Sequence, residues 1–319
     1  MKIVVLKGML KESHEKKIED TAEKVGAKVC FVKDEKDIPE DFKDAEVIYG
    51  FGINTAKTSK ALKWMCVPSA GVDAFVEPGF FANDDCLLSN SSGAYGVTIA
   101  EHIIAVTLMM MRKLTYTYEE ILNGVWGLPK PQKSLKDCRI TVLGTGDIGR
   151  TFAKRAKAFE PENIIGVCRS GKSDEESFDR VVKIEDLEEV LKETDLLVMS
   201  LPDTPETKGI LSEDKIKLLP EGAYIVNVGR GSAIDEIALA KYLENGKLGG
   251  AALDVFVNEP LPKESPLWKT KNLLITPHNA GNLTLDYTLN KNVDMFCEDL
   301  LNYSNGLLLK YIVDRKKGY

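Results

Sequence analysis

Short apolar runs alternate with polar, helix-forming stretches in the first third of the chain. Lys2–Leu6 and Lys28–Val32 have the pattern of strands, and the segment between them, Ser13–Val25, has that of a helix. Glu46–Tyr49 and Cys86–Ser89 predict two further strands. Because strands that alternate with helices are joined by right-handed crossovers, this pattern predicts a parallel sheet in an α/β domain.

The segment Thr98–Met111 breaks this alternation, since it is apolar on nearly every side. It is too long for a strand and too short to span a bilayer, so we expect a helix buried between domains or in a dimer interface. A looser stretch follows, with Gly124, Gly127, Pro129 and Pro131.

A second and clearer series begins at Arg139. Its apolar runs predict six strands, at Ile140–Leu143, Asn163–Val167, Leu196–Ser200, Ala223–Val228, Gly250–Asp254 and Leu273–Thr276. This pattern is typical of a doubly wound dinucleotide-binding domain. The last helical stretch, Leu283–Tyr303, has no strand after it and is expected to return to the first domain. We therefore predict an α/β fold of two doubly wound parallel-sheet domains, with a Rossmann domain (95–282) inserted in a flavodoxin-like substrate domain (1–94 plus 283–319).

Composition narrows the class of protein. With 319 residues the chain can form two domains of ordinary size. Its net charge of −7 argues against nucleic acid or a membrane surface as a partner. No window approaches about 18 apolar residues, so we expect a soluble, cytoplasmic protein. The six cysteines are scattered singly, which favours small buried hydrophobes over a metal site or disulfides.

A glycine-rich motif, Gly144 to Gly149, joins a predicted strand directly to a predicted helix over Arg150–Phe159. In that context Gly144 permits a tight turn, Gly146 lets the backbone approach a pyrophosphate, and Gly149 allows close helix packing. The free N–H groups of the helix would face the phosphates. The alternative is a glycine-rich turn without a ligand. The motif predicts dinucleotide binding.

The cofactor is selected about 20 residues further on, where NAD enzymes usually carry an acidic residue. Here the chain has Arg169 and Ser170, and no carboxylate until Asp174. Arg169 can clamp a 2′-phosphate and Ser170 can donate to it. Arg169 could also be an ordinary solvated side chain in a polar loop. We predict NADP as the cofactor, with NAD as the alternative.

Only three histidines are candidates for acid–base chemistry. His14 lies in a charged stretch and is expected to be solvated, and His102 lies in the apolar helix, where a core histidine is expected. His278 instead follows the last predicted strand, at the sheet edge where ligands of open α/β sheets bind.

Arg230 and Glu259 follow two other predicted strands and so lie at the same edge as His278. Hydride reduction of a 2-keto acid needs a cation for the carboxylate and an acid for the nascent alkoxide. A carboxylate beside the histidine orients it and favours its protonated form. The nicotinamide supplies the hydride chemistry. These three residues therefore predict a keto-acid reductase.

Five segments, in this order, resemble the motifs of the D-isomer-specific 2-hydroxyacid dehydrogenases. They are Gly144–Gly149, Leu201–Thr207, Asn227–Gly231, Asp254–Leu261 and Pro277–His278. The resemblance extends from Pro68–Asp73 to the tail Val313–Tyr319, and so covers most of the chain. It implies a two-domain subunit with the active site in the cleft, usually in a homodimer built around the long apolar helix.

The resemblance also implies residue roles. Arg230 would bind the substrate carboxylate, His278 would be the acid–base group and Glu259 its partner. The substrate carboxylate would also meet backbone N–H groups of Ala70, Gly71 and Val72. The cofactor would be bound by Gly144, Thr145, Gly146, Asp147, Ile148, Gly149, Arg169, Ser170, Leu201, Pro202, Thr207, Val228, Gly229, Asp254 and Ala280.

Several alternatives remain open at this point. Glu259 stands where formate dehydrogenase relatives have Gln, which points away from formate, and Arg169 makes the chain look closest to NADP-dependent glyoxylate/hydroxypyruvate reductases. Glyoxylate, hydroxypyruvate, pyruvate and bulkier keto acids all fit. Tyr49–Ile53 and Ser69–Phe75, together with Tyr95 and Trp126, could select among them. The alternative is that their aromatic side chains serve only in packing. Rival functions are a non-catalytic dinucleotide-sensing corepressor, another reaction on this fold, and a dimeric scaffold.

Overall fold

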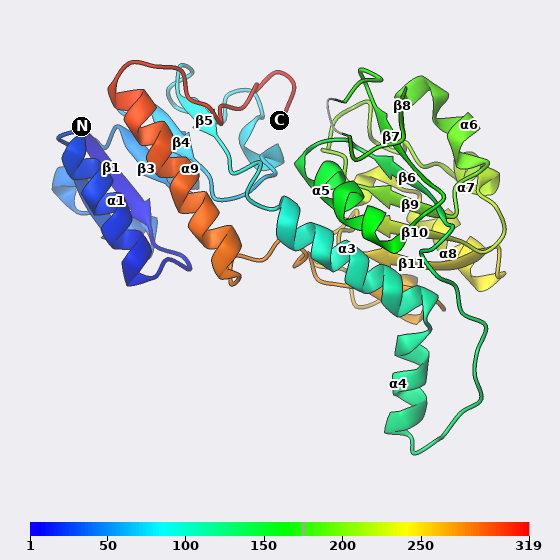
Figure 1. Cartoon of the computed structure of the whole chain (residues 1–319). Coiled ribbons are helices and arrows are strands. Elements are labelled where there is room, and N and C mark those ends of the chain that lie inside the picture. The colour runs from blue at the N-terminus through cyan, green and yellow to red at the C-terminus, as the bar shows by residue number, and fades with distance from the viewer. Residues whose placement is uncertain (174–175, 319) are drawn as a thin grey trace. The chain divides into compact units, whose positions relative to one another are not determined.

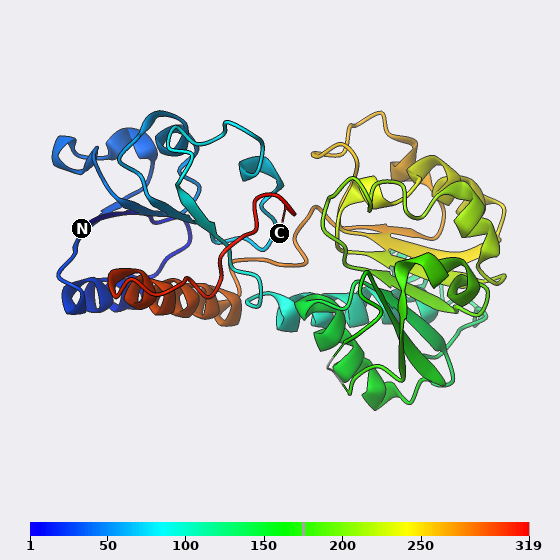
Figure 2. The ribbon, with the colours of Figure 1, turned by 90° about the horizontal axis from the view of Figure 1, so that it is seen from above.

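The computed structural model describes residues 1–173 and 176–318 and divides into two compact units (Figures 1 and 2). Unit 1 comprises Met1–Tyr95 and Asn282–Tyr319, and unit 2 comprises Gly96–Gly281. Asp174, named above as the next carboxylate after Arg169, lies outside the described residues.

Unit 1 is built on a five-stranded parallel sheet in the order β2-β1-β3-β4-β5, the flavodoxin-like order. Its elements are β1 (Lys2–Leu6), α1 (Glu12–Lys24), β2 (Lys28–Val32), β3 (Val47–Tyr49), α2 (Ile53–Thr58), β4 (Trp64–Cys66), β5 (Leu87–Ser89) and α9 (Asp286–Ser304).

Successive residues of β1 point to opposite faces of this sheet and into different cores. Ile3 and Val5 pack with Ile18 of α1 and Phe296 of α9, and all four are fully buried. Val4 packs on the other face, in a cluster with Ala56 of α2. Figure 2 shows α1 and α9 side by side along one face of the sheet. The last helix thus supplies part of the core of unit 1.

His14 is buried, so the expectation that it is solvated was wrong. Its Nδ1 accepts a hydrogen bond from the Lys11 backbone N–H at 3.1 Å, and its Nε2 lies 2.7 Å from Asn290 Oδ1 on α9. The charged neighbour Lys11 instead pairs with Asp286 at the surface. Because α9 returns to cover α1, a residue in a charged stretch becomes an interhelical contact.

Unit 2 contains a seven-stranded parallel sheet in the order β12-β11-β10-β9-β6-β7-β8, the Rossmann order with one added strand. Its elements are α3 (Gly96–Met111), α4 (Leu114–Leu122), β6 (Arg139–Leu143), α5 (Asp147–Ala156), β7 (Asn163–Cys168), β8 (Arg180–Lys183), α6 (Leu187–Leu191), β9 (Leu196–Met199), α7 (Glu213–Leu218), β10 (Ala223–Asn227), α8 (Glu236–Glu244), β11 (Leu248–Leu253) and β12 (Leu273–Ile275). Helices α3 and α5 pack together beside this sheet, while α6, α7 and α8 share a core with its strands (Figure 1).

The predicted α/β fold of two parallel-sheet domains is confirmed, as are the strands expected from the apolar runs. The short elements α2, β4 and β8 were not predicted, and neither was α4, where a looser stretch was expected. The strand β4 has only three residues, and β8 is an edge strand with exposed, charged ends. Neither is long enough to show the periodicity on which a prediction rests. Among the described residues, no helix is both long and apolar enough to cross a membrane.

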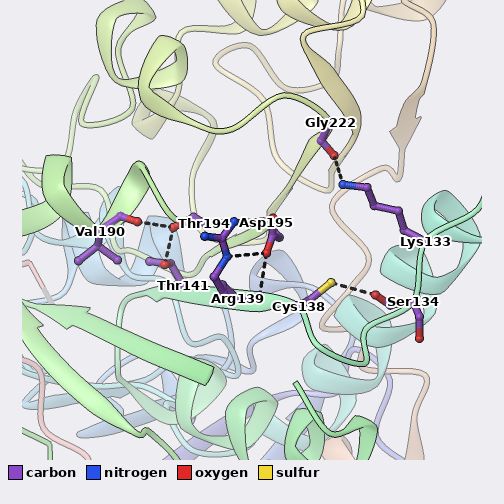
Figure 3. Close-up of polar contacts among 9 residues, drawn as sticks. All are labelled: Lys133, Ser134, Cys138, Arg139, Thr141, Val190, Thr194, Asp195 and Gly222. Carbon is purple, nitrogen blue, oxygen red and sulfur yellow. Dashed lines mark hydrogen bonds and ion pairs between the residues drawn. The ribbon is translucent and has the colours of Figure 1, made fainter. Parts of the chain in front are cut away.

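The amino ends of the unit 2 strands are held by structural polar contacts (Figure 3). Arg139, which opens β6, binds Asp195, which precedes β9, through Nε at 2.9 Å and Nη2 at 3.1 Å. Partial burial opposes ionisation of Asp195, but the hydrogen bonds from Arg139 outweigh it and hold the pKa of that carboxyl below its ordinary value. Nearby, the hydroxyls of Thr141 and Thr194 lie 2.7 Å apart. The proposed site residues of unit 2 lie at the opposite, carboxyl ends of the strands.

Candidate active site

The glycine loop joins β6 directly to α5. Gly144 has a φ of 105°, a left-handed value that favours glycine. A Cβ on Gly149 would lie 2.0 Å from the carbonyl oxygen of Gly144, so α5 can approach the loop this closely only with glycine there. At Gly146, in contrast, a Cβ would meet no atom within 4 Å. The loop is therefore tightly packed on its inner side and open at its middle glycine.

Helix α5 begins beyond Gly146, which provides no side-chain cap. The first-turn N–H groups of Asp147, Ile148 and Gly149 are not needed by the helix itself and suit a phosphate. The Asp147 carboxylate is engaged elsewhere, accepting from the Gly96 N–H at 2.8 Å. This open glycine, followed by a helix N-terminus, fits the pyrophosphate of a dinucleotide.

His278 and Glu259, two of the predicted residues, are in direct polar contact at the carboxyl edge of this sheet. His278 Nδ1 lies 2.6 Å from Glu259 Oε2, and Glu259 Oε1 accepts from the Phe256 N–H at 2.8 Å. An ionised carboxylate only accepts, so Nδ1 carries a proton and Nε2 is the ring atom left for a substrate. The pair is half-exposed, as a group that exchanges protons with a ligand must be.

His278 has a φ of 49°, in the left-handed region that a non-glycine residue enters at a cost of about 1–3 kcal/mol. Its N–H donates to Asp254 O at 2.9 Å and to Thr276 O at 3.0 Å. The strained backbone is thus fixed by the end of β11. Such strain at an exposed histidine supports a functional role for its orientation.

Asp254 organises the loop that carries His278. It is 3% exposed, and its carboxylate accepts from Thr276 Oγ1 at 2.6 Å and from the Asn279 and Ala280 N–H groups at 2.9 and 3.0 Å. These bonds satisfy the oxygens of a carboxylate that is otherwise costly to bury. Asp254 and Ala280, both predicted to bind the cofactor, therefore touch each other and shape the loop.

His102 belongs to the same network, which sequence reasoning missed. Its Nε2 lies 3.4 Å from Thr276 Oγ1, whose own proton goes to Asp254, so His102 is the donor in this contact. Burial lowers the pKa of His102, and the negative charge of Asp254 partly opposes this. The expectation of a core histidine holds only in part, because this one is half-buried and hydrogen-bonded beneath the His278 loop.

Arg230 follows β10 and begins the turn into α8. Its carbonyl accepts from Asn227 Nδ2 at 2.9 Å, and its Nη1 donates to Gly229 O at 2.8 Å. A Cβ on the next residue, Gly231, would lie 1.9 Å from the carbonyl carbon of Phe256. The backbone next to Arg230 is therefore packed directly against the loop that carries Glu259.

Five further predicted cofactor residues lie in the loops after β9 and β10. Gly229 packs on Leu201, where a Cβ would come within 2.6 Å of the Leu201 backbone. Thr207 Oγ1 donates to Pro202 O at 2.7 Å and so closes the loop on itself. Val228 is buried and donates its N–H to Met199 O. These residues shape the carboxyl edge of the sheet.

The segment that would select the cofactor is exposed. Ser170 Oγ donates to Lys172 O at 3.0 Å and lies 3.4 Å from Cys168 Sγ. The charge of Arg169 helps to lower the pKa of Glu206, after that residue's own backbone and Thr204 hydrogen bonds. Arg169 thus has an acidic neighbour that the sequence did not reveal, because Glu206 lies on a different loop.

The predicted substrate loop belongs to unit 1 and follows β4. Ser69 Oγ donates to Gly71 O at 2.7 Å, Asn90 Nδ2 donates to Ala70 O at 2.7 Å, and Val72 is buried. Both carbonyls are thereby held by side chains of unit 1. Tyr95 is buried, and its hydroxyl donates to Pro68 O.

Among the described residues, no three or more His, Cys, Asp and Glu side chains are grouped as metal ligands. Cys66, Cys86, Cys138 and Cys297 are buried, whereas Cys30 and Cys168 are half-buried.

Comparison with known proteins agrees with this geometry. Residues 104–280 match the family model described as "D-isomer specific 2-hydroxyacid dehydrogenase, NAD binding domain". The chain belongs to the D-isomer-specific 2-hydroxyacid dehydrogenase family. The members of this family are NAD(P)-dependent oxidoreductases of small 2-hydroxy and 2-keto acids.

Individual 2-hydroxyacid dehydrogenases are similar to this chain over most of their length. Glyoxylate/hydroxypyruvate reductase A of Salmonella paratyphi C is 30% identical over 266 residues, which cover 82% of this chain and 83% of the relative. A family member from Aeromonas salmonicida superposes with a TM-score of 0.87 at 29% identity, covering 98% and 99% of the two chains. One from Xanthobacter autotrophicus, in complex with NADPH and MES, gives a TM-score of 0.82 at 26% identity, covering 99% of each chain.

Proposed function

We propose that this 2-hydroxyacid dehydrogenase reduces small 2-keto acids to D-2-hydroxy acids with NADPH in preference to NADH. The observation that carries the proposal is the 2.6 Å pair of His278 Nδ1 and Glu259 Oε2, in the same unit as an open glycine loop. A keto-acid reductase needs both parts, whereas a dinucleotide sensor or a scaffold has no need of the pair.

Each residue has a distinct task in this proposal. Arg230 binds the substrate carboxylate through its planar guanidinium and draws electron density from the neighbouring ketone. His278 donates the proton on Nε2 to the ketone oxygen as that oxygen becomes an alkoxide. Glu259 holds Nδ1 and stabilises the imidazolium form. Backbone N–H groups of Ala70, Gly71 and Val72 are proposed as further donors to the carboxylate, on the strength of the family resemblance.

The dinucleotide, when bound, supplies the hydride. Its pyrophosphate would meet Gly146 and the first turn of α5, and its nicotinamide the edge formed by Asp254 and Ala280. A 2′-phosphate would meet Arg169 and Ser170. NADP preference is supported by that arginine and by the NADPH complex of the Xanthobacter relative.

The substrate range is proposed as small keto acids such as glyoxylate and hydroxypyruvate, in line with the name of the Salmonella relative. The test is a panel of glyoxylate, hydroxypyruvate, pyruvate and bulkier 2-keto acids, each assayed with NADPH and NADH. We expect NADPH-dependent reduction of at least one of them. His278→Gln should lower kcat about 10²–10⁴-fold, the usual contribution of a positioned acid.

A direct binding titration separates the rival function. If NADPH binds but no keto acid of the panel oxidises it, a non-catalytic sensor replaces the proposed reductase. If the variant His278→Gln keeps more than a third of the wild-type rate, His278 is not the proton donor.

A further inference from the structure

Glu236 is a carboxylate close to the His278–Glu259 pair that the proposed function does not use. It is the first residue of α8, and its Oε1 accepts from the Val257 N–H at 2.8 Å. The helix does not need it as a cap, because Asp235 Oδ1 already accepts from the Ile237 and Ala238 N–H groups. Its side chain therefore turns from α8 to the loop after β11.

That loop is held by two carboxylates on successive amides. The Phe256 N–H donates to Glu259 Oε1 at 2.8 Å, and the next N–H, of Val257, donates to Glu236 Oε1 at the same distance. The remaining oxygen of Glu259 binds His278. Consecutive amides are close together, so the two carboxylates lie on neighbouring points of one short loop.

The two charges act on each other. Burial raises the pKa of Glu236 above its ordinary value, the hydrogen bond from Val257 opposes this, and the negative charge of Glu259 adds to the rise. Asp235 is the charged neighbour on its own helix, and it is engaged with backbone N–H groups. The charged group on the loop that Glu236 binds is Glu259, which in turn binds His278.

Glu236 also ties the Glu259 loop to the segment that carries Arg230. This segment runs from Arg230 through Gly231 into α8, and Gly231 is pressed on the backbone of Phe256. Gly231 and Glu236 thus contact adjacent residues of one loop from one segment. The contacts fix the spacing between the proposed cation and the proposed acid within unit 2.

We propose that Glu236 is a positioning residue for the Glu259–His278 pair, fixing its loop through Val257 and favouring the proton on the pair through its negative charge. The inference rests on the proposed function for its effect on catalysis. Its effect on the imidazole and on the loop does not depend on turnover.

Two variants separate the hydrogen bond from the charge. E236Q keeps an acceptor for the Val257 N–H and loses the charge, whereas E236A loses both. In E236Q we expect the alkaline limb of keto-acid reduction to move to lower pH by about 0.3–1 unit, the size expected for the loss of one nearby, partly screened charge. At pH values low enough to protonate Glu236, E236Q and wild type should turn over equally. In E236A kcat should also fall severalfold at every pH, because the loop is less well fixed.

Imidazole titration by NMR tests the same inference without turnover. The chain has three histidines, so the signal of His278 is assigned from a His278→Gln spectrum. In E236Q the titration midpoint of His278 should move to lower pH, and in E236A the Val257 amide should also exchange faster with solvent. A midpoint and a pH–rate profile unchanged in both variants would overturn the proposal, even if E236A unfolds at a lower temperature. If the midpoint of His278 shifts in E236Q but wild type shows no reductase activity, only the proposed function is rejected.

Discussion

Arg230 has the strictest geometric task among the three proposed active-site residues. A carboxylate and a guanidinium can share two parallel hydrogen bonds, which an ammonium cannot reproduce. Arg230→Lys keeps the charge, and we expect it to lower kcat/KM for keto-acid reduction at least about tenfold. Steady-state kinetics with varied keto acid measure this, and NADPH affinity, measured by fluorescence titration, is the control. An equal loss of NADPH affinity would assign Arg230 to the cofactor.

Arg169 decides the cofactor preference in the proposal. Charge-assisted bonds to a phosphate contribute about 1.5–3 kcal/mol each, so wild type should prefer NADPH by roughly ten- to a hundredfold in kcat/KM. Arg169→Asp should reverse the preference, because a carboxylate repels the 2′-phosphate and accepts from a 2′-hydroxyl.

The acidic neighbour of Arg169 offers a matched variant. Glu206 is acted on by the charge of Arg169, so Glu206→Gln should strengthen NADPH binding and leave NADH binding nearly unchanged. Dissociation constants for both dinucleotides, with wild type and both variants, are the measurement. A wild type that uses NADH as well as NADPH would contradict the role given to Arg169.

Sequence position alone placed Arg230, Glu259 and His278 at one edge, because the carboxyl ends of parallel strands meet there. The same reasoning could not find Glu236 or His102. Glu236 opens a helix, where an acidic residue is expected for reasons of the helix dipole alone. His102 lies in an apolar helix, and its contact with Thr276 crosses 174 positions of the chain. A residue that contacts other residues of the site, and not a ligand, leaves no recognisable pattern in the local sequence.

At the scale of elements, the glycine loop and α5 make a matched pair of substitutions possible. A Cβ on Gly149 would lie 2.0 Å from Gly144 O, so Gly149→Ala should force α5 outward and cost about 1–3 kcal/mol. Gly146→Ala meets nothing within 4 Å and has an ordinary negative φ, so it should leave stability nearly unchanged. It should nevertheless weaken NADPH binding, because the methyl group occupies the place of the pyrophosphate.

Thermal unfolding and NADPH titration of both variants check this pair. We expect a lower midpoint temperature only for Gly149→Ala, and weaker NADPH binding with an unchanged midpoint for Gly146→Ala. Unchanged NADPH affinity in Gly146→Ala would contradict the place given to the pyrophosphate.

Helix α3 is linked to the loop after β12 through His102, and this link depends on pH. Burial holds the pKa of His102 below its ordinary value of 6.5, so the unfolded chain binds this proton more readily than the folded one. The stability that the folded protein gains from keeping His102 neutral is therefore fully present above about pH 6.5, and it is lost as the pH falls below that value. Between pH 7.5 and 5.5, roughly one unit either side of 6.5, the variant His102→Gln should therefore lose less stability than wild type. Thermal midpoints of both proteins, measured in parallel, decide this, and parallel curves would contradict it.

The elements that the sequence predicted are those with a long, regular apolar pattern. β1, β2 and β6 were predicted with at most one residue of difference, because each contains an apolar run between polar stretches. β8 was missed because an edge strand buries little and needs no apolar run. The residues of β4 are all buried, but three of them cannot display a period.

At the scale of the whole molecule, each unit has its own sheet and core, and the chain leaves unit 1 after Tyr95 and returns to it at Asn282. This discontinuity was expected because Leu283–Tyr303 had no strand to follow in the second series. The helix it forms, α9, buries Phe296 and Leu300 against the strands of unit 1. A terminal helix without a strand partner therefore carried information about topology.

The homodimer expected from the family resemblance, built around the long apolar helix α3, would also need to cover a surface that begins on the next helix of unit 2. Figure 1 shows α4 extending away from the sheet of unit 2, with a long segment after it. Tyr118 and Leu122 on this helix are 66% and 69% exposed, and Trp126 and Leu128 after it are 94% and 82% exposed. Apolar side chains exposed together at this level are typical of an interface. We expect a second copy of this chain to cover them.

Charges placed on the arm formed by α4 and the segment after it (residues 114–128) test that expectation. Light scattering after size exclusion should give wild type a mass near twice the 35.3 kDa of one chain. Leu122→Glu combined with Trp126→Glu should give a monomer, because a dimer would bury two unpaired charges per subunit. Leu308→Glu is the control, since Leu308 is 90% exposed in unit 1 and lies outside the arm. A monomeric wild type would reject the homodimer, and a doubly substituted dimer would place its interface elsewhere, for instance on the exposed stripe of α3 at Glu101, Ala105 and Met109.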